Sequence, residues 1–159
     1  MTSRAIVLRD KERWQQITEK LPLYLDSDGF AKFFPDSTYG SEWLTSYLLA
    51  ISHEAGYELP VGPREKMIEA LKNFVAGKVS RSYQISTSDL SLRKVTAIEA
   101  LSRYDEAKPD MFDSIQVQPN LWPTSTVLEY YNILRRVPGI PQSQTQIASV
   151  DQILRGRLN

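Results

Sequence analysis

The sequence predicts an all-α protein, and three observations carry this prediction. Apolar residues recur at spacings of three and four along successive segments, which is typical of one buried face of an α-helix. Glycine and proline residues stand between these segments, where they end helices. No segment alternates convincingly between apolar and polar residues. With 42% hydrophobic residues, the 159-residue chain has enough apolar side chains for a core, which excludes a wholly disordered protein.

The first half of the chain is predicted to form three helices, over residues 10–20, 41–55 and 63–77. The Ser41 hydroxyl can accept a backbone N–H of the first turn of the second helix, and Gly56 can end that helix in a left-handed conformation. The short linker that follows indicates an antiparallel pair with the third helix. The apolar stripes consist of Trp14 and Ile17, then Trp43, Leu44, Tyr47, Leu48, Ile51 and Ala55, and then Met67, Ile68, Leu71, Phe74 and Val75.

The second half is predicted to form three more helices, over residues 88–104, 123–137 and 143–158, with one short helix over 109–115. The apolar stripes consist of Leu92, Val95, Ile98 and Leu101, then Val127, Leu128, Tyr131, Leu134 and Val137, and then Ile147, Val150, Leu154 and Leu158. The best strand candidates are Tyr83 with Ile85 and Ile115 with Val117, and each pair is brief.

Composition excludes several classes of site and partner. The chain has no cysteine, so it holds no disulfide, no thiolate zinc ligand and no cysteine nucleophile. Its 19 basic and 19 acidic residues give zero formal net charge, which removes the broad electrostatic argument for nucleic acid as a partner. No apolar run reaches the roughly 18–20 residues of a membrane span. The apolar run near the N-terminus is too short for a signal peptide, as expected of a cytosolic protein or of a piece of a longer secreted one.

Two polar groups of residues are candidates for chemistry. His53 is the single histidine and lies off the apolar stripe of its helix. It could act as a general base, but no nucleophile partner can be identified, so a surface histidine without a catalytic role is favoured. Asp26, Asp28 and Asp36 faintly resemble a calcium loop, but the later ligands that such a loop needs are missing. The favoured interpretation is a turn, in which these side chains bind nearby backbone N–H groups and Gly29 takes a positive φ.

An aromatic concentration follows the acidic residues. It allows either an aromatic-lined ligand groove or a loop that folds back as the hydrophobic plug of a helical bundle, and the plug is favoured because large aromatic side chains usually serve cores. The residues are Phe30, Phe33, Phe34, Tyr39 and Trp43.

The C-terminal third carries a second set of aromatic residues and a mild basic bias. Tyr131 lies on an apolar stripe, Trp122 lies at the entry of that helix, and Tyr130 is expected to be exposed or to face a neighbouring domain. The arginines stand late in helices, where a cation offsets the negative end of the helix dipole. They are Arg135, Arg136, Arg155 and Arg157. We predict no catalytic residue, no cofactor and no metal ligand within this chain.

Several ordered motifs resemble the thioester-domain region of bacterial alpha-2-macroglobulins. Residues 24–35, YLDSDGFAKFFP, precede a helix that opens as GSEWLTSYLL over 40–49, and AGYELP follows at 55–60. Family members carry a similar "DG…F" turn before a helix of the type "GS/D…LT.YLL…..AG". Further similar segments are WPTST at 122–126, ILRRVPGIP at 133–141 and ILRGRLN at 153–159.

The resemblance implies that residues 1–159 are part of an α/α toroid, a ring of helical hairpins related in fold to terpene cyclases. In this family a Cys-x-Glu-Gln thioester motif closely precedes a segment resembling residues 2–5, so the reactive Cys and Gln are expected just upstream of Thr2 if the parent has them. We therefore expect both ends of the chain to be cuts through a larger helical array.

By the same resemblance, the parent protein is expected to be a broad-spectrum endopeptidase inhibitor of the bacterial periplasm or cell envelope. It traps proteases after they cleave a bait region, and the partners of this segment are then the parent's other domains and the target proteases. The segment is not expected to be an enzyme, to bind nucleic acid or to carry a transmembrane segment.

Two other classes stay open. Stacked helical hairpins present binding surfaces, so the chain could be a stand-alone helical-repeat adaptor. A toroid-fold enzyme related to terpene cyclases needs an aspartate-rich motif or a zinc site, and the absence of cysteine together with a single histidine disfavours the zinc version.

Overall fold

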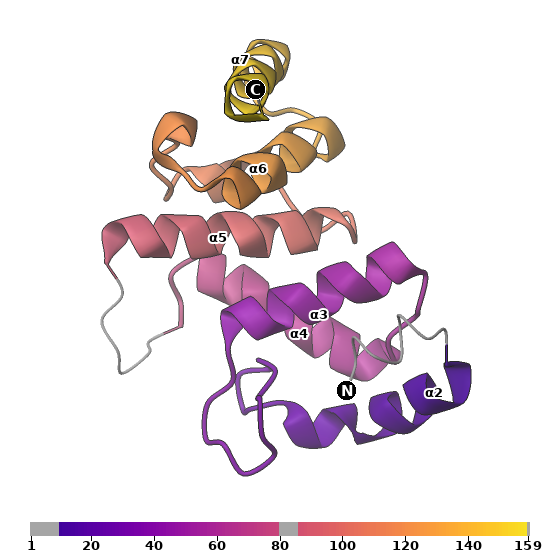
Figure 1. Ribbon diagram of the computed structural model, residues 1–159. Coiled ribbons are helices and arrows are strands. Elements are labelled where there is room, and N and C mark those ends of the chain that lie inside the picture. The colour runs from indigo at the N-terminus through magenta and orange to yellow at the C-terminus, as the bar shows by residue number, and fades with distance from the viewer. Residues whose placement is uncertain (1–9, 80–85, 159) are drawn as a thin grey trace. The chain divides into compact units, whose positions relative to one another are not determined.

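The computed structural model describes residues 10–79 and 86–158, and it confirms the all-α class (Figure 1). Within these residues the regular structure is helical, apart from one isolated antiparallel bridge between Leu25 and Ala31. The chain divides into two compact units, Met1–Asn73 and Phe74–Asn159, which are described separately below. No helix within the described ranges is both long enough and apolar enough to cross a membrane.

The first unit contains α2 (Lys11–Lys20), the 3-10 turn η1 (Leu21–Tyr24), α3 (Glu42–Ala55) and most of α4 (Val61–Val75). The predicted caps of α3 are confirmed: the Ser41 hydroxyl accepts the Leu44 N–H at 3.3 Å, and Gly56 takes a left-handed φ of 69°. α4 begins two residues before Pro63. The proline therefore lies in the first turn, where its missing N–H removes no intrahelical hydrogen bond.

The loop between η1 and α3 is organised by the Asp26 carboxylate. Oδ1 accepts the N–H groups of Asp28 and Phe30 at 3.0 and 2.9 Å, and Oδ2 accepts the N–H of Gly40 at 2.7 Å. Gly29 takes a φ of 93° within the same turn. The predicted turn chemistry is confirmed for Asp26, because both oxygens of its carboxylate accept hydrogen bonds from backbone N–H groups.

Two glycines allow close backbone approaches around this loop. A Cβ on Gly29 would lie 2.6 Å from the carbonyl oxygen of Lys66 on α4, and a Cβ on Gly40 would lie 2.3 Å from the carbonyl oxygen of Phe30. The loop then joins the start of α3, where the Thr45 hydroxyl oxygen accepts the Ala31 N–H at 2.8 Å. These contacts fix the backbone from which the exposed side chains of the loop project.

The orientation of α3 corrects the predicted apolar stripe. Trp43 is 53% exposed, and Leu44, Tyr47, Leu48, Ile51 and Ala55 are only partly buried. The buried face instead carries Glu42, Thr45, Ser46, Leu49 and Ser52. The physical reason lies in local hydrogen bonds: the three buried hydroxyls donate to the backbone carbonyls four residues earlier, at 2.6 to 2.7 Å. Hydroxyls that are already bonded to their own helix can be buried without unsatisfied polar groups.

The second unit contains α5 (Thr87–Ser102), η2 (Pro109–Phe112), η3 (Pro119–Leu121), α6 (Thr124–Arg136) and α7 (Ser143–Leu158). α6 packs against both α5 and α7, so consecutive helices pair in this unit (Figure 1). The short helix expected over 109–115 is the 3-10 helix η2 followed by turns. The brief strand candidate at Ile115 and Val117 forms no strand, in agreement with the all-α prediction, and the candidate at Tyr83 and Ile85 lies outside the described residues.

The aromatic core of this unit reverses the expected roles of two adjacent tyrosines. Tyr130 is 3% exposed and contacts the rings of Phe112 and Trp122 edge to face, at centroid distances of 5.7 and 5.5 Å. Tyr131 is only partly buried. The phenol group of Tyr130 donates to the side-chain oxygen of Gln146 on α7, and burial raises the pKa of Tyr130 to about 12. Because its hydroxyl is hydrogen-bonded, the Tyr130 side chain can be buried in the core without an unsatisfied polar group.

Candidate functional site

Neither of the two polar candidates, His53 and the group of Asp26, Asp28 and Asp36, belongs to a cluster of described side chains that could hold a metal ion. His53 is exposed in the last turn of α3. Asp28 and Asp36 are exposed, and Asp26 is engaged by the backbone of its own loop. No group of three or more histidine, aspartate or glutamate side chains in residues 10–79 and 86–158 is placed to hold a metal ion.

The aromatic concentration divides into a core residue and an exposed set. Phe30 is fully buried, as expected of a hydrophobic plug. The other four residues are between 53% and 70% exposed: Phe33, Phe34, Tyr39 and Trp43. Trp43 also stacks on Tyr47, with ring centroids 5.8 Å apart and planes 7° from parallel. Both sequence interpretations therefore hold in part, because one aromatic side chain fills the core while its neighbours form a surface.

A groove of about 540 Å³ opens beside this surface within the first unit. One face of α2, which includes Ile17, forms one wall, and Leu44 and Leu48 of α3 form another. Phe33 and Phe34 complete the lining from the loop. The volume lies in the range of typical ligand pockets. We name this feature the aromatic groove, and it is the candidate functional site of the chain.

The four predicted arginines lie late in α6 and α7, as expected, and each also contacts a specific partner. Arg135 lies over the Tyr131 ring at 5.7 Å, and the Arg155 Nε donates to Asp151 at 2.7 Å. The Arg157 guanidinium donates to three carbonyl oxygens around η3, at 2.8 to 3.3 Å. These contacts account for three of the arginines without an anionic ligand.

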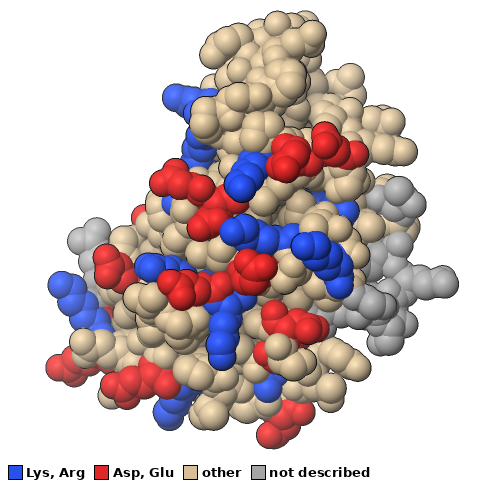
Figure 2. All heavy atoms as spheres, turned by 180° about the vertical axis from the view of Figure 1, so that it is seen from behind, with Lys and Arg blue, Asp and Glu red and all other residues tan. Residues whose placement is uncertain are grey.

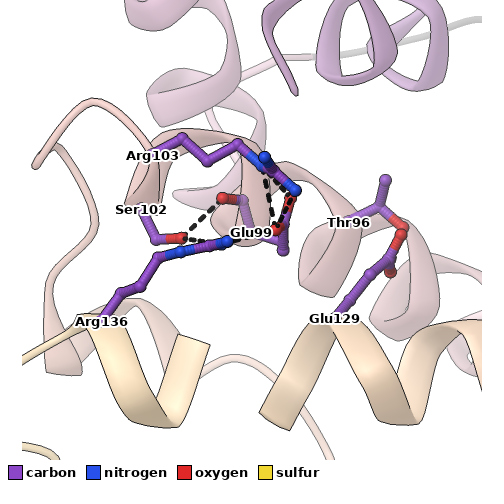
Figure 3. Close-up of polar contacts among 6 residues, drawn as sticks. All are labelled: Thr96, Glu99, Ser102, Arg103, Glu129 and Arg136. Carbon is purple, nitrogen blue, oxygen red and sulfur yellow. Dashed lines mark hydrogen bonds and ion pairs between the residues drawn. The ribbon is translucent and has the colours of Figure 1, made fainter. Parts of the chain in front are cut away.

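The fourth, Arg136, belongs to a network that joins α5 to α6 (Figure 3). Glu99 on α5 has a side chain only 6% exposed, and two arginines converge on it. Arg103 donates to both carboxylate oxygens at 3.0 Å, and Arg136 Nη1 donates to Oε1 at 2.6 Å. The Ser102 hydroxyl accepts a weaker contact from Arg136 at 3.4 Å. The spacing of Glu99 and Arg103 is visible in the sequence as an i, i+4 pair, but the third partner, 37 residues away, carries no such signal.

A second carboxylate, Glu129 of α6, points toward α5 beside this network (Figure 3). Its Oε2 accepts the Thr96 hydroxyl at 2.8 Å. Burial raises the pKa of the Glu129 carboxyl to about 6, the Thr96 hydrogen bond opposes the rise, and the nearby charge of Glu99 adds to it. This residue was also not foreseen, because its burial depends on how α5 and α6 pack.

Glu129 should make the stability of the second unit depend on pH. Its folded pKa lies above the ordinary value of 4.5, so its contribution is complete below pH 4.5 and is lost as pH rises through about 6. After a discount for partial exposure, we expect this group alone to lower the free energy of unfolding by about 1 kcal/mol between pH 4.5 and 7.5. The Glu129→Gln variant should lose that component. Urea unfolding followed by circular dichroism across this range measures the difference, and parallel pH profiles of the two proteins would contradict the assignment.

Lys94 is a further buried polar residue that the sequence did not single out. It is 6% exposed on α5, and its ammonium group donates to the Ser114 hydroxyl at 2.9 Å. Burial lowers the pKa of this lysine. The contact links α5 to the turn after η2, which gives the lysine a structural role.

Charged side chains show no segregation on the molecular face drawn in Figure 2, where described basic and acidic residues are interspersed. This arrangement agrees with the zero net charge of the chain. A continuous basic surface of the kind that follows a nucleic-acid backbone is not seen among the described residues on that face.

No family model and no curated protein matches the sequence. Among solved structures, the chain is similar to alpha-2-macroglobulin of E. coli, determined by cryo-EM in its native conformation, with a TM-score of 0.64. The sequences are 15% identical, and the match covers 86% of this chain and 9% of the other. At this identity the likeness shows a shared fold, and the chain spans a small part of the length of the protein it resembles.

Proposed function

We propose that this chain is a non-catalytic segment of a protease-trapping inhibitor of the alpha-2-macroglobulin type. The observation that carries the proposal is the fold likeness to E. coli alpha-2-macroglobulin over 86% of the chain. The motifs at 24–35, 40–49 and 133–141 support it from the sequence, in the order in which the family has them. Residues 1–159 then form part of an α/α toroid within a larger multidomain protein.

In this proposal the chemistry lies outside the segment. The parent protein is cleaved in a bait region by the attacking protease, changes conformation and encloses the protease. If the parent has a thioester, its Cys and Gln lie just upstream of Thr2, and the toroid shields them until activation. The parent acts in the periplasm or cell envelope, and this segment contacts its other domains and the trapped protease.

A trapping assay on the full-length parent protein tests the proposal. The protein is incubated with trypsin, and hydrolysis of casein is compared with hydrolysis of a small chromogenic peptide. We expect casein hydrolysis to fall while peptide hydrolysis continues, because an enclosed protease still admits small substrates. Equal hydrolysis of both substrates at the uninhibited rate would exclude the trapping function. Prior treatment with methylamine, which opens thioesters, shows whether covalent capture contributes.

A second candidate function is a helical adaptor that binds other proteins, and the aromatic groove is the observation that favours it. An adaptor would leave both trypsin activities unchanged in the assay above. The coding sequence on either side of this segment provides an independent test, because an adaptor needs neither a bait region nor a thioester motif.

A further inference from the structure

The aromatic groove is built to expose apolar side chains on a fixed backbone. Phe33 and Phe34 are 59% and 70% exposed. The residue before them is anchored at both ends, since the Lys32 N–H donates to Tyr24 at 2.7 Å and its ammonium group donates to the Pro35 carbonyl at 2.6 Å. The Asp26 hydrogen bonds hold the rest of the loop. Two adjacent phenylalanines are thus presented outward without an ordering step at the moment of binding.

The second wall of the groove comes from the apolar side of α3, which faces away from the buried polar side. Leu44 and Leu48 are one helical turn apart and line the groove while remaining only partly buried. The core of the unit does not cover them, because the core-facing side of α3 carries Thr45, Ser46 and Ser52. The α3 wall of the groove is therefore an apolar surface whose two leucines are spaced by one helical turn.

The described charged residues that line the groove are all basic, although the whole chain has zero formal net charge. Arg13 and Lys20 on α2 and Lys32 on the loop line it, and no aspartate or glutamate is among the described residues of its lining. Neither Arg13 nor Lys20 forms a side-chain ion pair with another described residue. Arg13 and Lys20 are seven positions apart, which is close to two helical turns, so they lie on one face of α2 about 10 Å apart. Carboxylates on an occupant would find positive partners along one edge of the groove.

We propose that the aromatic groove binds a polypeptide segment of a partner protein in which large apolar side chains are flanked by aspartate or glutamate. The apolar side chains lie against Phe33, Phe34 and Leu48, and the carboxylates face Arg13 and Lys20. A polypeptide fits better than a lipid surface, because the site is a concavity with walls from three elements. Apolar anchors in such a groove are a recurring mode of peptide recognition. The inference does not rest on the proposed trapping function, and it applies equally to an adaptor.

The test uses a phage-displayed library of random 12-residue peptides selected on the 159-residue chain. We expect the recovered peptides to be enriched in Asp or Glu beside Phe, Leu, Ile or Trp and depleted in Lys and Arg. Recovered peptides are then synthesised, and their affinity is measured by fluorescence anisotropy. The Phe33→Ser/Phe34→Ser double variant and the Lys20→Glu variant should each weaken binding by about tenfold or more. These three residues are exposed, so the variants should keep the far-UV spectrum of the wild type.

Matched controls lie outside the groove. Leu121→Ser changes another exposed apolar residue and Lys78→Glu another exposed lysine, and both should bind the peptides as the wild type does. Recovery of no peptides, of peptides without the acidic and apolar bias, or of peptides that bind the groove variants equally well would overturn the proposal.

Two further measurements separate other occupants of the same surface. Co-sedimentation with vesicles of phosphatidylcholine and phosphatidylserine should show no binding, and binding lost in the Phe33→Ser/Phe34→Ser variant would overturn the proposal in favour of a membrane surface. Analytical ultracentrifugation should show a monomer, and a dimer abolished by the same variant would overturn it in favour of a second copy of the chain. A negative trypsin assay on the parent protein would leave the peptide result standing, so failures of the two proposals are distinguishable.

Discussion

Replacement of Gly40 by alanine is expected to lower the free energy of unfolding by about 3 kcal/mol or more. The new Cβ would lie 2.3 Å from the carbonyl oxygen and 2.7 Å from the Cβ of Phe30, a residue with no solvent exposure. Neither side can move freely. The Phe30 carbonyl accepts the Asp26 N–H at 2.9 Å, and the Gly40 N–H donates to the Asp26 carboxylate.

Gly62→Ala is the matched control, because it makes the same change in the same unit where a Cβ would meet no atom within 4 Å. Because Gly62 lies near the start of α4, we expect the alanine to leave the free energy of unfolding unchanged or to raise it by less than about 1 kcal/mol. Chemical denaturation followed by circular dichroism measures both variants. If the two substitutions lowered stability equally, the close approach of Gly40 to Phe30 would not be what the fold depends on.

The second large effect is expected for Glu99→Ala. Removing this carboxylate leaves Arg103 and Arg136 facing each other at the junction of α5 and α6, with the Arg103 side chain 13% and the Arg136 side chain 34% exposed. Loss of one partner from a buried ion pair typically destabilises by about 3–5 kcal/mol, and the partial exposure of Arg136 places our expectation at the lower end, about 3 kcal/mol.

Asp151→Ala provides the comparison, since Asp151 also pairs with an arginine four residues away at 2.7 Å, but on an exposed surface of α7. Exposed pairs of this kind contribute little, so the melting temperature should stay within experimental error of the wild type. Thermal unfolding of both variants at low and high salt measures the contrast. A Glu99→Ala protein as stable as Asp151→Ala would show that the junction of α5 and α6 does not depend on the Glu99 carboxylate.

The helices were predictable because their signals are local. Ser41, Gly56 and the spacing of apolar residues act within one or two turns, and the structure has those helices at nearly the predicted positions. The turn at Asp26 was predictable for the same reason, since aspartate, serine and glycine form hydrogen bonds within a few residues.

The faces of the helices were harder to predict, because they depend on partners far along the chain. The apolar stripe assigns Trp43 to the core and Thr45 to the surface, but in the structure Trp43 is exposed and Thr45 is buried. Thr45 and Ser46 can be buried because their hydroxyls donate hydrogen bonds to backbone carbonyls of the same helix. Tyr130 can be buried in the core because the side-chain oxygen of Gln146, on another helix, accepts a hydrogen bond from its hydroxyl. The sequence allowed two interpretations of the aromatic residues, a ligand groove and a hydrophobic plug. Only the tertiary structure shows that Phe30 is buried as a plug while Phe33 and Phe34 stay exposed beside the groove.

The buried hydroxyl face of α3 bears on how this protein could be engineered for handling in the laboratory. A redesign guided by hydropathy would replace Thr45 and Ser46 with larger aliphatic residues and leave Trp43 in place as an apparent core residue. Such changes would place larger side chains at positions that are already fully buried, and they would leave the apolar side of the helix exposed to solvent. Colloidal behaviour should instead be adjusted at Trp43, where the indole is 53% exposed and its removal opens no cavity in the core.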